Sequence, residues 1–176
     1  MCIRDSGYIS EDRKKEGLIL IHNVLDNASI TVWSQIKGII GFVTDKMISQ
    51  KVNPFIDQLE VKTPSNYQLI SNLSGGNQQK VMFSKWLNTQ PKVFILDEPT
   101  RGIDVGAKAE VHNMICELAD QGMAILCISS DLPEVLAMSD RVLVMREGRQ
   151  MGILDGSQAT QESIMSLAMG ELQETA

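Results

Sequence analysis

The chain has 176 residues, and its 16 Lys and Arg against 22 Asp and Glu give a formal net charge of −6. This acidic balance argues against a protein whose main task is to coat nucleic acid. Hydrophobic residues make up 43% and charged residues 22% of the chain, which is ordinary globular usage and excludes a disordered chain. The three cysteines form no C-x-x-C pair, and no apolar run reaches the roughly 18 residues of a membrane helix. We therefore expect an intracellular globular protein of about one domain.

Strands and helices alternate along the sequence, which predicts an α/β fold with a mostly parallel sheet. Two continuous apolar runs, 93–96 and 124–128, are predicted to be strands buried on both faces. Pro54 is expected to kink or split the helix at 41–59. The other predicted elements are a strand at 7–10, helices at 24–30, 77–87, 106–121, 132–138 and 160–169, and a hairpin at 141–145 and 150–154. The side chains expected in the core include Trp33, Trp86, Cys116 and Cys127.

The first motif with chemical potential is Leu-Ser-Gly-Gly-Asn-Gln-Gln-Lys at residues 73–80. Two glycines at a helix start leave backbone N–H groups exposed, and the helix dipole adds partial positive charge there. Ser74 adds a hydroxyl, so the turn that it forms with Gly75 and Gly76 can bind a phosphate. Taken alone, an ordinary helix cap is the better explanation, because such turns are common.

The second motif is the apolar run 93–96 followed by Asp97, Glu98, Pro99 and Thr100. A parallel sheet binds its ligands at the carboxyl ends of its strands, which is where these two carboxylates stand. Asp97 suits a Mg²⁺ ion held largely through water, and Glu98 suits the polarisation of an attacking water. In isolation, a solvated acidic turn explains the same residues.

In this order, the two motifs resemble the signature and Walker B motifs of the ATP-binding-cassette (ABC) ATPases. Three further segments fall in the family's order: Tyr8 to Glu11 where the Q-loop begins, Gly102 to Asp104 at the D-loop, and Ser129 to Asp131 at the switch. The resemblance implies the three-layer fold of P-loop NTPases with a helical subdomain, and it implies ATP and Mg²⁺ as cofactors.

A narrower resemblance covers the chain from about residue 7 to its end. Residues 8–14, 62–65, 97–108 and 130–135 look like the second, C-terminal cassette of the ATP-binding subunits of bacterial monosaccharide importers of the ribose, galactose and xylose types. This resemblance implies an ATPase subunit that powers sugar uptake. The sugar itself cannot be read from the sequence, because specificity lies in partner proteins.

The sequence departs from the family pattern at several places. It has no G-x-x-x-x-G-K-[ST] motif, so the Walker A loop that holds the β- and γ-phosphates is missing. Glu11 stands where most members have Gln, Ser130 where most have His, and Asn77 where most have the fifth-position Gln of the signature. The resemblance implies composite ATP sites, so we expect the turn at 74–76 to contact ATP held by the first cassette. Glu98 then belongs to a second, degenerate site, and Asp104 works across the dimer interface.

The resemblance also implies how the chain is organised. We expect a leader outside the family at 1–6, a Q-loop region at 7–22, a helical subdomain at 23–72, a core with signature, Walker B, D-loop and switch at 73–156, and a C-terminal helix and tail at 157–176. Because the leader fits no element, we expect a chain truncated at its N-terminus, without hydrolytic activity on its own. The implied partners are the first cassette, its dimer mate, membrane permease subunits and, indirectly, a periplasmic sugar-binding protein. Its place would be the cytoplasmic face of the bacterial inner membrane.

Two other classes remain open. One is a soluble ABC ATPase of DNA repair or translation, against which the acidic charge and the Thr-Arg-Gly-Ile-Asp continuation at 100–104 argue. The other is a cassette that hydrolyses nothing itself and only completes a partner's ATP site. A nucleic-acid surface at Arg13, Lys14 and Lys15 is disfavoured, because acidic residues flank this short run, and we expect it to be a solvated turn.

Overall fold

The computed structural model describes residues 5–36 and 43–170. The predicted leader up to residue 4, with Cys2, lies outside these residues, as do positions 37–42 of the predicted helical subdomain and the tail after residue 170. The chain divides into two units, Met1–Ile128 and Ser129–Ala176, which are taken separately below.

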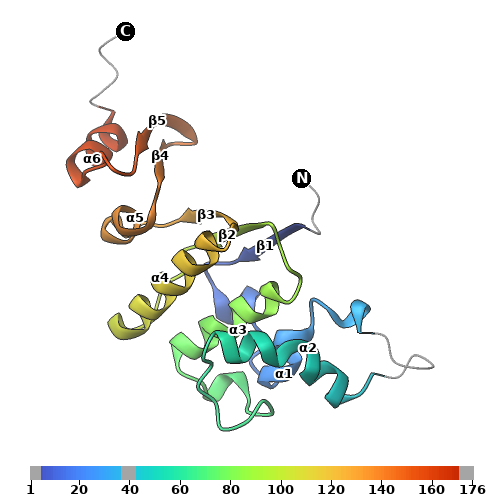
Figure 1. Ribbon diagram of the computed structural model, residues 1–176. Helices are drawn as coiled ribbons and strands as arrows, with labels where there is room; N and C mark the ends of the chain where they lie inside the picture. Colours follow the sequence, from blue (N-terminus) through green and yellow to red (C-terminus); the bar gives the residue numbers. More distant parts are fainter. Residues whose placement is uncertain (1–4, 37–42, 171–176) are drawn as a thin grey trace. The chain divides into compact units, whose positions relative to one another are not determined.

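A parallel three-stranded sheet organises the first unit (Figure 1). Its strands are β1 (Ser6–Ile9), β2 (Val93–Asp97) and β3 (Ala124–Ile128), in the order β1-β2-β3. Ile9 pairs with Leu96, and Leu96 pairs with Cys127. The α/β fold with a parallel sheet is therefore confirmed. Because the strands are parallel, the carboxyl ends of β1, β2 and β3 lie at one edge of the sheet.

The side chains on the two faces of this sheet differ in their exposure to solvent. On one face Phe94 and Leu96 are fully buried, and the ring of Phe83 meets that of Phe94 edge-on at 5.4 Å between centroids. The opposite face leaves Leu126 52% and Ile128 49% exposed. The prediction that 124–128 is buried on both faces is wrong. An apolar run identifies a strand but carries no information on whether a second layer covers it.

The first unit also contains the helices α1 (Val24–Ser29), α2 (Asp45–Gln58), α3 (Gly75–Leu87) and α4 (Val105–Asp120), of which α3 packs on β1 and α4 on β3. Helix α1 packs on both α2 and α3, and α3 packs on α4. Helix α2 continues through Pro54, so of the two outcomes predicted there, a kink or a split into two helices, the split is wrong. Val52 and Ile56 are buried on either side of Pro54, and this packing offsets the loss of one backbone donor.

Several side chains predicted to lie in the core do not. Trp33 is 53% exposed, and its indole N–H donates to the Ser29 hydroxyl at 2.7 Å. Cys116 is exposed on α4, whereas Trp86 and Cys127 are half-buried. An indole N–H needs a polar partner, which favours a position at the margin of the core rather than in its interior.

The second unit consists of α5 (Leu132–Met138), the antiparallel hairpin β4 (Arg141–Arg146) and β5 (Arg149–Asp155), and α6 (Gln161–Met169). Its core is built from Val142, Val144, Ile164 and Leu167. The predicted hairpin is confirmed, as is the last helix, which begins at a capping box between Thr160 and Ser163. Within the described residues, no helix combines the length and apolar character needed to cross a membrane.

Candidate functional site

The turn at the start of α3 is capped by Ser74, as the sequence predicted. The exposed Ser74 hydroxyl accepts hydrogen bonds from the backbone N–H of Asn77 at 3.4 Å and from its side-chain amide at 3.0 Å. The carbonyl oxygen of the same Asn77 side chain accepts from the Lys62 backbone N–H at 2.7 Å. Asn77 therefore ties the capping serine to the segment that follows α2. Its Oδ1 and Nδ2 assignments follow from this hydrogen-bond pattern.

Both glycines of this turn lie close to other parts of the chain. A Cβ atom on Gly76 would lie 2.7 Å from the Cβ of Ala107, so α3 and α4 approach each other here closely enough to exclude a side chain. A Cβ atom on Gly75 would lie 3.2 Å from the carbonyl oxygen of Gly102. The turn at 74–76 is thus brought next to the turn at 102–104, which the sequence singled out separately.

Asp97 and Glu98 stand at the carboxyl end of β2. A carboxylate oxygen of Asp97 accepts a hydrogen bond from the Tyr8 hydroxyl at 3.1 Å. Partial burial, together with this hydrogen bond and the charge of Asp97, raises the pKa of Tyr8. Because β1 and β2 are neighbours, the end of one strand places a phenol against the acid at the end of the other.

Glu98 has a left-handed backbone conformation, with φ of 48°. A residue with a side chain adopts it at a cost of about 1–2 kcal/mol, so the surroundings must hold it in place. The backbone N–H of Glu98 donates to the carbonyl of Ile128 at 2.8 Å, and its carbonyl accepts from the N–H of Arg101 at 3.1 Å. These two bonds fix the backbone of Glu98 between the end of β3 and the turn that follows β2.

The turn at 101–104 leads into α4. Asp104 caps this helix, since its Oδ1 accepts from the Ala107 backbone N–H at 2.9 Å. Glu11 forms an ion pair with the guanidinium of Arg101. This ion pair therefore connects the loop after β1, which carries the predicted site residue Glu11, to the turn after β2.

Ser130 belongs to the second unit and is exposed there. Its neighbour Ser129 donates to the carboxylate of Glu134 at 2.7 Å and accepts from the Asp131 backbone N–H at 3.1 Å. The loop before α5 is therefore ordered by its own side chains. Of the predicted site residues, Ser74 and Asn77 are hydrogen-bonded to each other. The bonds described above for Glu11, Asp97, Glu98 and Asp104 go to other residues, and Ser130 lies within the second unit.

Sequence reasoning missed Arg13. Instead of lying in a solvated turn, its guanidinium donates to the carbonyls of Arg101 at 2.6 Å and Gly102 at 2.8 Å. No local pattern could have indicated these contacts, because the partners are 88 and 89 positions apart in the sequence. A hollow of about 320 Å³ is lined here by Glu11, Asp12, Arg13, Lys14 and Arg101.

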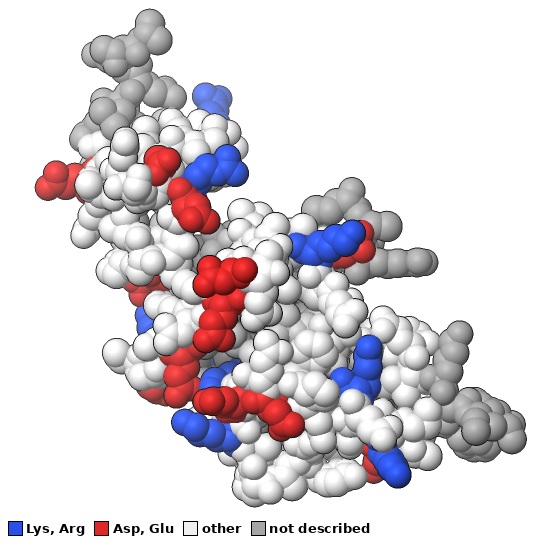
Figure 2. All heavy atoms as spheres, in the orientation of Figure 1, with Lys and Arg blue, Asp and Glu red and all other residues white. Residues whose placement is uncertain are grey.

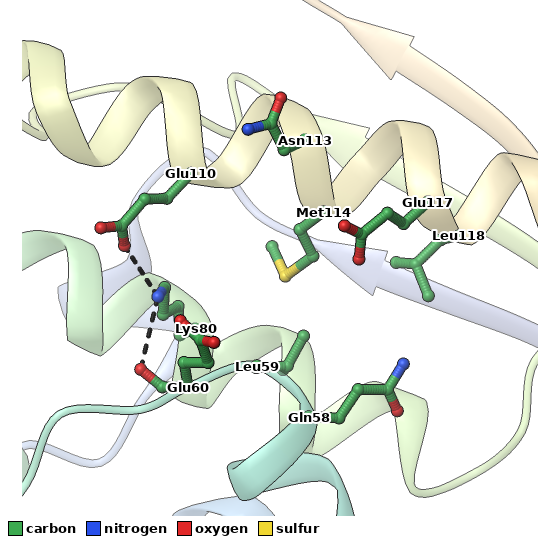
Figure 3. Close-up of a pocket in the computed structure, with 9 residues that line it drawn as sticks. All are labelled: Gln58, Leu59, Glu60, Lys80, Glu110, Asn113, Met114, Glu117 and Leu118. Atoms are coloured by element: carbon green, nitrogen blue, oxygen red, sulfur yellow. Dashed lines mark hydrogen bonds and ion pairs between the residues drawn. The ribbon is translucent and has the colours of Figure 1, made fainter.

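A second hollow, of about 230 Å³, lies between the end of α2, α3 and α4 (Figure 3). None of the predicted site residues lines it. At its wall the ammonium group of Lys80 meets the carboxylate of Glu110 and the backbone carbonyl of Glu60. These bonds link α3 to α4 and to the segment after α2, so they indicate a structural role for Lys80 rather than a ligand-binding site.

The described residues contain no cluster of three or more His, Cys, Asp or Glu side chains that could enclose a metal ion. A magnesium ion does not require one, because Mg²⁺ keeps most of its water ligands and binds proteins through one or two carboxylates. The half-buried carboxylate of Asp97, which the sequence predicted to hold Mg²⁺, has the chemistry for such an ion. On the face drawn in Figure 2, basic side chains lie singly or in small groups among acidic ones rather than in one continuous patch.

Comparisons with known proteins show which proteins the chain resembles. The profile of the ABC transporter family matches residues 5–101. A ribose/galactose/methyl galactoside import ATP-binding protein of Agrobacterium fabrum is 53% identical over 161 residues, which are 92% of this chain and 31% of the relative. A relative of the same description from Geobacillus kaustophilus is 52% identical over 170 residues, 96% of this chain and 33% of its own. The chain thus spans about a third of the length of the curated relatives that it matches.

Solved structures show the same fold. A bacterial ABC transporter cassette, solved as a dimer, superimposes with a TM-score of 0.71 at 18% identity, covering 86% of this chain and 63% of the cassette. The cbiO1 protein of Clostridium perfringens, part of the cbiONQ transporter complex, gives a TM-score of 0.74 at 22% identity over 97% of this chain and 64% of its own. At these identities the likeness concerns the fold.

Proposed function

Because the chain belongs to the ABC transporter family, we propose that it is part of the ATP-binding subunit of a bacterial monosaccharide importer. The observation that carries this proposal is an identity of more than 50% over at least 92% of the chain to sugar-import ATP-binding proteins. In this function, binding and hydrolysis of ATP by paired cassettes drive a membrane permease. The subunit would work at the cytoplasmic face of the inner membrane, with a periplasmic sugar-binding protein supplying the permease.

Within this function, we assign the turn at 74–76 to ATP held by a partner cassette. Ser74 is exposed and offers its hydroxyl at the N-terminus of a 13-residue helix, where backbone N–H groups and the helix dipole favour phosphate. Asp104, which lies in the adjoining turn, would face the same interface. Asn77 acts on this site by holding the Ser74 side chain.

The carboxylates at the end of β2 belong to the second site of the pair. Glu98, fixed by its two backbone hydrogen bonds, would orient a water molecule, and Asp97 would hold Mg²⁺ through water. A bound Mg²⁺ would neutralise charge on the phosphates. Glu11 and Ser130 take the positions at which most family members have Gln and His, so we propose that this second site is the weaker of the two in hydrolysis.

The test compares charge insertion at two neighbouring serines in the full-length protein that carries this sequence. Ser74→Arg places a bulky cation in the proposed phosphate turn, and Ser71→Arg places the same side chain at an exposed serine three residues earlier. We expect Ser74→Arg to lower ATP turnover at least tenfold and Ser71→Arg to leave it within twofold. Glu98→Gln should lower turnover less than Ser74→Arg does.

Vanadate trapping of nucleotide distinguishes the two sites. If Glu98→Gln abolished turnover while Ser74→Arg did not, the assignment of roles would be reversed. If neither change affected ATP turnover or trapping, the chain would not take part in ATP hydrolysis as proposed.

A further inference from the structure

Arg13 joins segments that are far apart in the sequence. It opens the short helical turn Arg13–Gly17 after β1, where the carboxylate of Asp12 accepts from the backbone N–H groups of Lys14 and Lys15. From there the Arg13 side chain reaches the turn after β2. Its two terminal nitrogens each donate to a different carbonyl, those of Arg101 and Gly102. The rigid fork of a guanidinium suits such a pair of acceptors, whereas an ammonium group does not.

The same guanidinium borders the start of α3. A Cβ atom on Gly75 would lie 3.0 Å from Nη2 of Arg13. Gly102, whose carbonyl receives that nitrogen, has a φ of +67° and would accept another residue only with strain. Three segments therefore meet at one side chain: the loop after β1, the turn at 102–104 and the turn at 74–76.

The position of Arg13 is costly for a charged side chain. Its Nε atom is buried without a hydrogen-bond partner among the described residues, and burial lowers the pKa of the guanidinium. An arginine needed only for solubility would extend into water, as basic side chains at surfaces generally do. The ion pair between Glu11 and Arg101 joins the same two segments a second time. We refer to this ion pair and the two Arg13 hydrogen bonds together as the Arg13 clasp.

We propose that Arg13 is a positioning residue that holds the turn at 102–104 against the turn at 74–76 and links both to the loop after β1. The inference rests on the proposed function for its consequence, because both turns are there assigned to the ATP interface. Arg13 itself contacts no nucleotide in this proposal. Its guanidinium sets where the backbone of the two turns lies.

The contact is tested first by backbone hydrogen exchange in the full-length protein, which requires neither nucleotide nor activity. Arg13→Met keeps an unbranched apolar stem and removes the donors of the guanidinium, Arg13→Lys keeps the charge, and Lys14→Met removes the adjacent exposed cation as a control. We expect exchange over residues 99–104 to rise about tenfold in Arg13→Met, by a smaller factor in Arg13→Lys, and by less than twofold in Lys14→Met. Helix α2, at 45–58 in the same unit as Arg13, serves as an internal reference for intact folding.

Unchanged exchange over 99–104 in Arg13→Met would overturn the proposal. If Arg13→Met lost protection at 45–58 as well, the milder Arg13→Lys would decide: faster exchange confined to 99–104 supports the clasp, and unchanged exchange overturns it. The exchange result stands whether or not the protein hydrolyses ATP, so it is independent of the Ser74→Arg test.

The consequence for function is tested by steady-state ATP turnover. We expect Arg13→Met to lower kcat at least fivefold and to change the KM for ATP less than twofold, because misplaced turns impair closure on bound ATP more than its binding. Arg13→Lys should recover part of the loss. If Ser74→Arg abolished turnover while Arg13→Met left kcat within twofold, the positioning role would be refuted although the proposed function would stand.

Discussion

The ammonium nitrogen of Lys80 lies 2.8 Å from a carboxylate oxygen of Glu110, which joins α3 to α4 (Figure 3). The two side chains differ in environment, since Lys80 is 8% and Glu110 48% exposed. Lys80 also donates to the backbone carbonyl of Glu60 at 3.4 Å, just after the end of α2. One buried cation thereby fixes the helix that carries the Ser74 turn relative to two other helices.

We expect Glu110→Gln to lower the free energy of unfolding by about 1–2 kcal/mol. The loss arises because the buried Lys80 side chain loses its carboxylate partner, and the exposure of Glu110 limits the effect. Urea denaturation measures it as a lower midpoint at an unchanged m value. The matched control is Glu117→Gln, on the same helix and lining the same hollow, whose carboxylate forms no ion pair among the described residues. Equal losses in the two variants would contradict the prediction.

The same pair predicts a pH dependence. The hydrogen bond and charge of Lys80 lower the pKa of Glu110 from its usual 4.5. A carboxylate with a lowered pKa in the folded state stabilises the fold fully above its unfolded pKa, and this contribution is lost as the pH falls through the folded value. The difference in stability between the natural chain and Glu110→Gln should therefore be constant from pH 7 to 5 and shrink below 4.5. A difference that persisted unchanged in acid would rule this out.

Close packing between α3 and α4 gives a third prediction. Gly76→Ala puts a methyl group 2.7 Å from the Cβ of Ala107, and we expect a loss of about 1–3 kcal/mol. Gly106→Ala in the first turn of α4 meets only the Asp104 carboxylate, at 3.4 Å, and should be neutral or stabilise by up to about 1 kcal/mol. Thermal unfolding compares the two. Recovery in the double variant with Ala107→Gly would assign the loss to this contact, and additive losses would refute it.

Local patterns predicted most elements but not the contacts between them. The helices predicted at 77–87 and 160–169 correspond to α3 (Gly75–Leu87) and α6 (Gln161–Met169), because the signals that start a helix lie in a few adjacent residues. The exposure of β3 was not, because an apolar run does not state what covers it. Arg13 was misread as solvated for the related reason that its partners lie in a distant turn. The five-segment division of the chain and the roles of the site residues stay predictions.

The last prediction concerns Asp97 and uses the fact that the chain has two tyrosines. Each donates to a carboxylate at 3.1 Å, Tyr8 to Asp97 and Tyr67 to Asp45, and the pKa of each phenol is raised. Asp97→Asn should lower the pKa of Tyr8 without returning it to 10.0, because burial, the largest cause of its shift, remains. Tyr67, whose shift comes first from its hydrogen bond to Asp45, should not respond to Asp97→Asn. Asp45→Asn should have the converse effect.

Spectrophotometric titration of tyrosinate in this chain, repeated in Tyr8→Phe to assign the two transitions, measures both values. Removal of a carboxylate favours ionisation of the tyrosine that donates to it. The negative charge that disfavours the tyrosinate and the acceptor that stabilises the protonated phenol are both lost. If Asp97→Asn moved neither transition, Tyr8 would not contact the acid at the end of β2. A shift of the Tyr8 transition alone would instead show that the Asp97 carboxylate contacts the Tyr8 hydroxyl in solution, as it does at the carboxyl end of β2 in the structure.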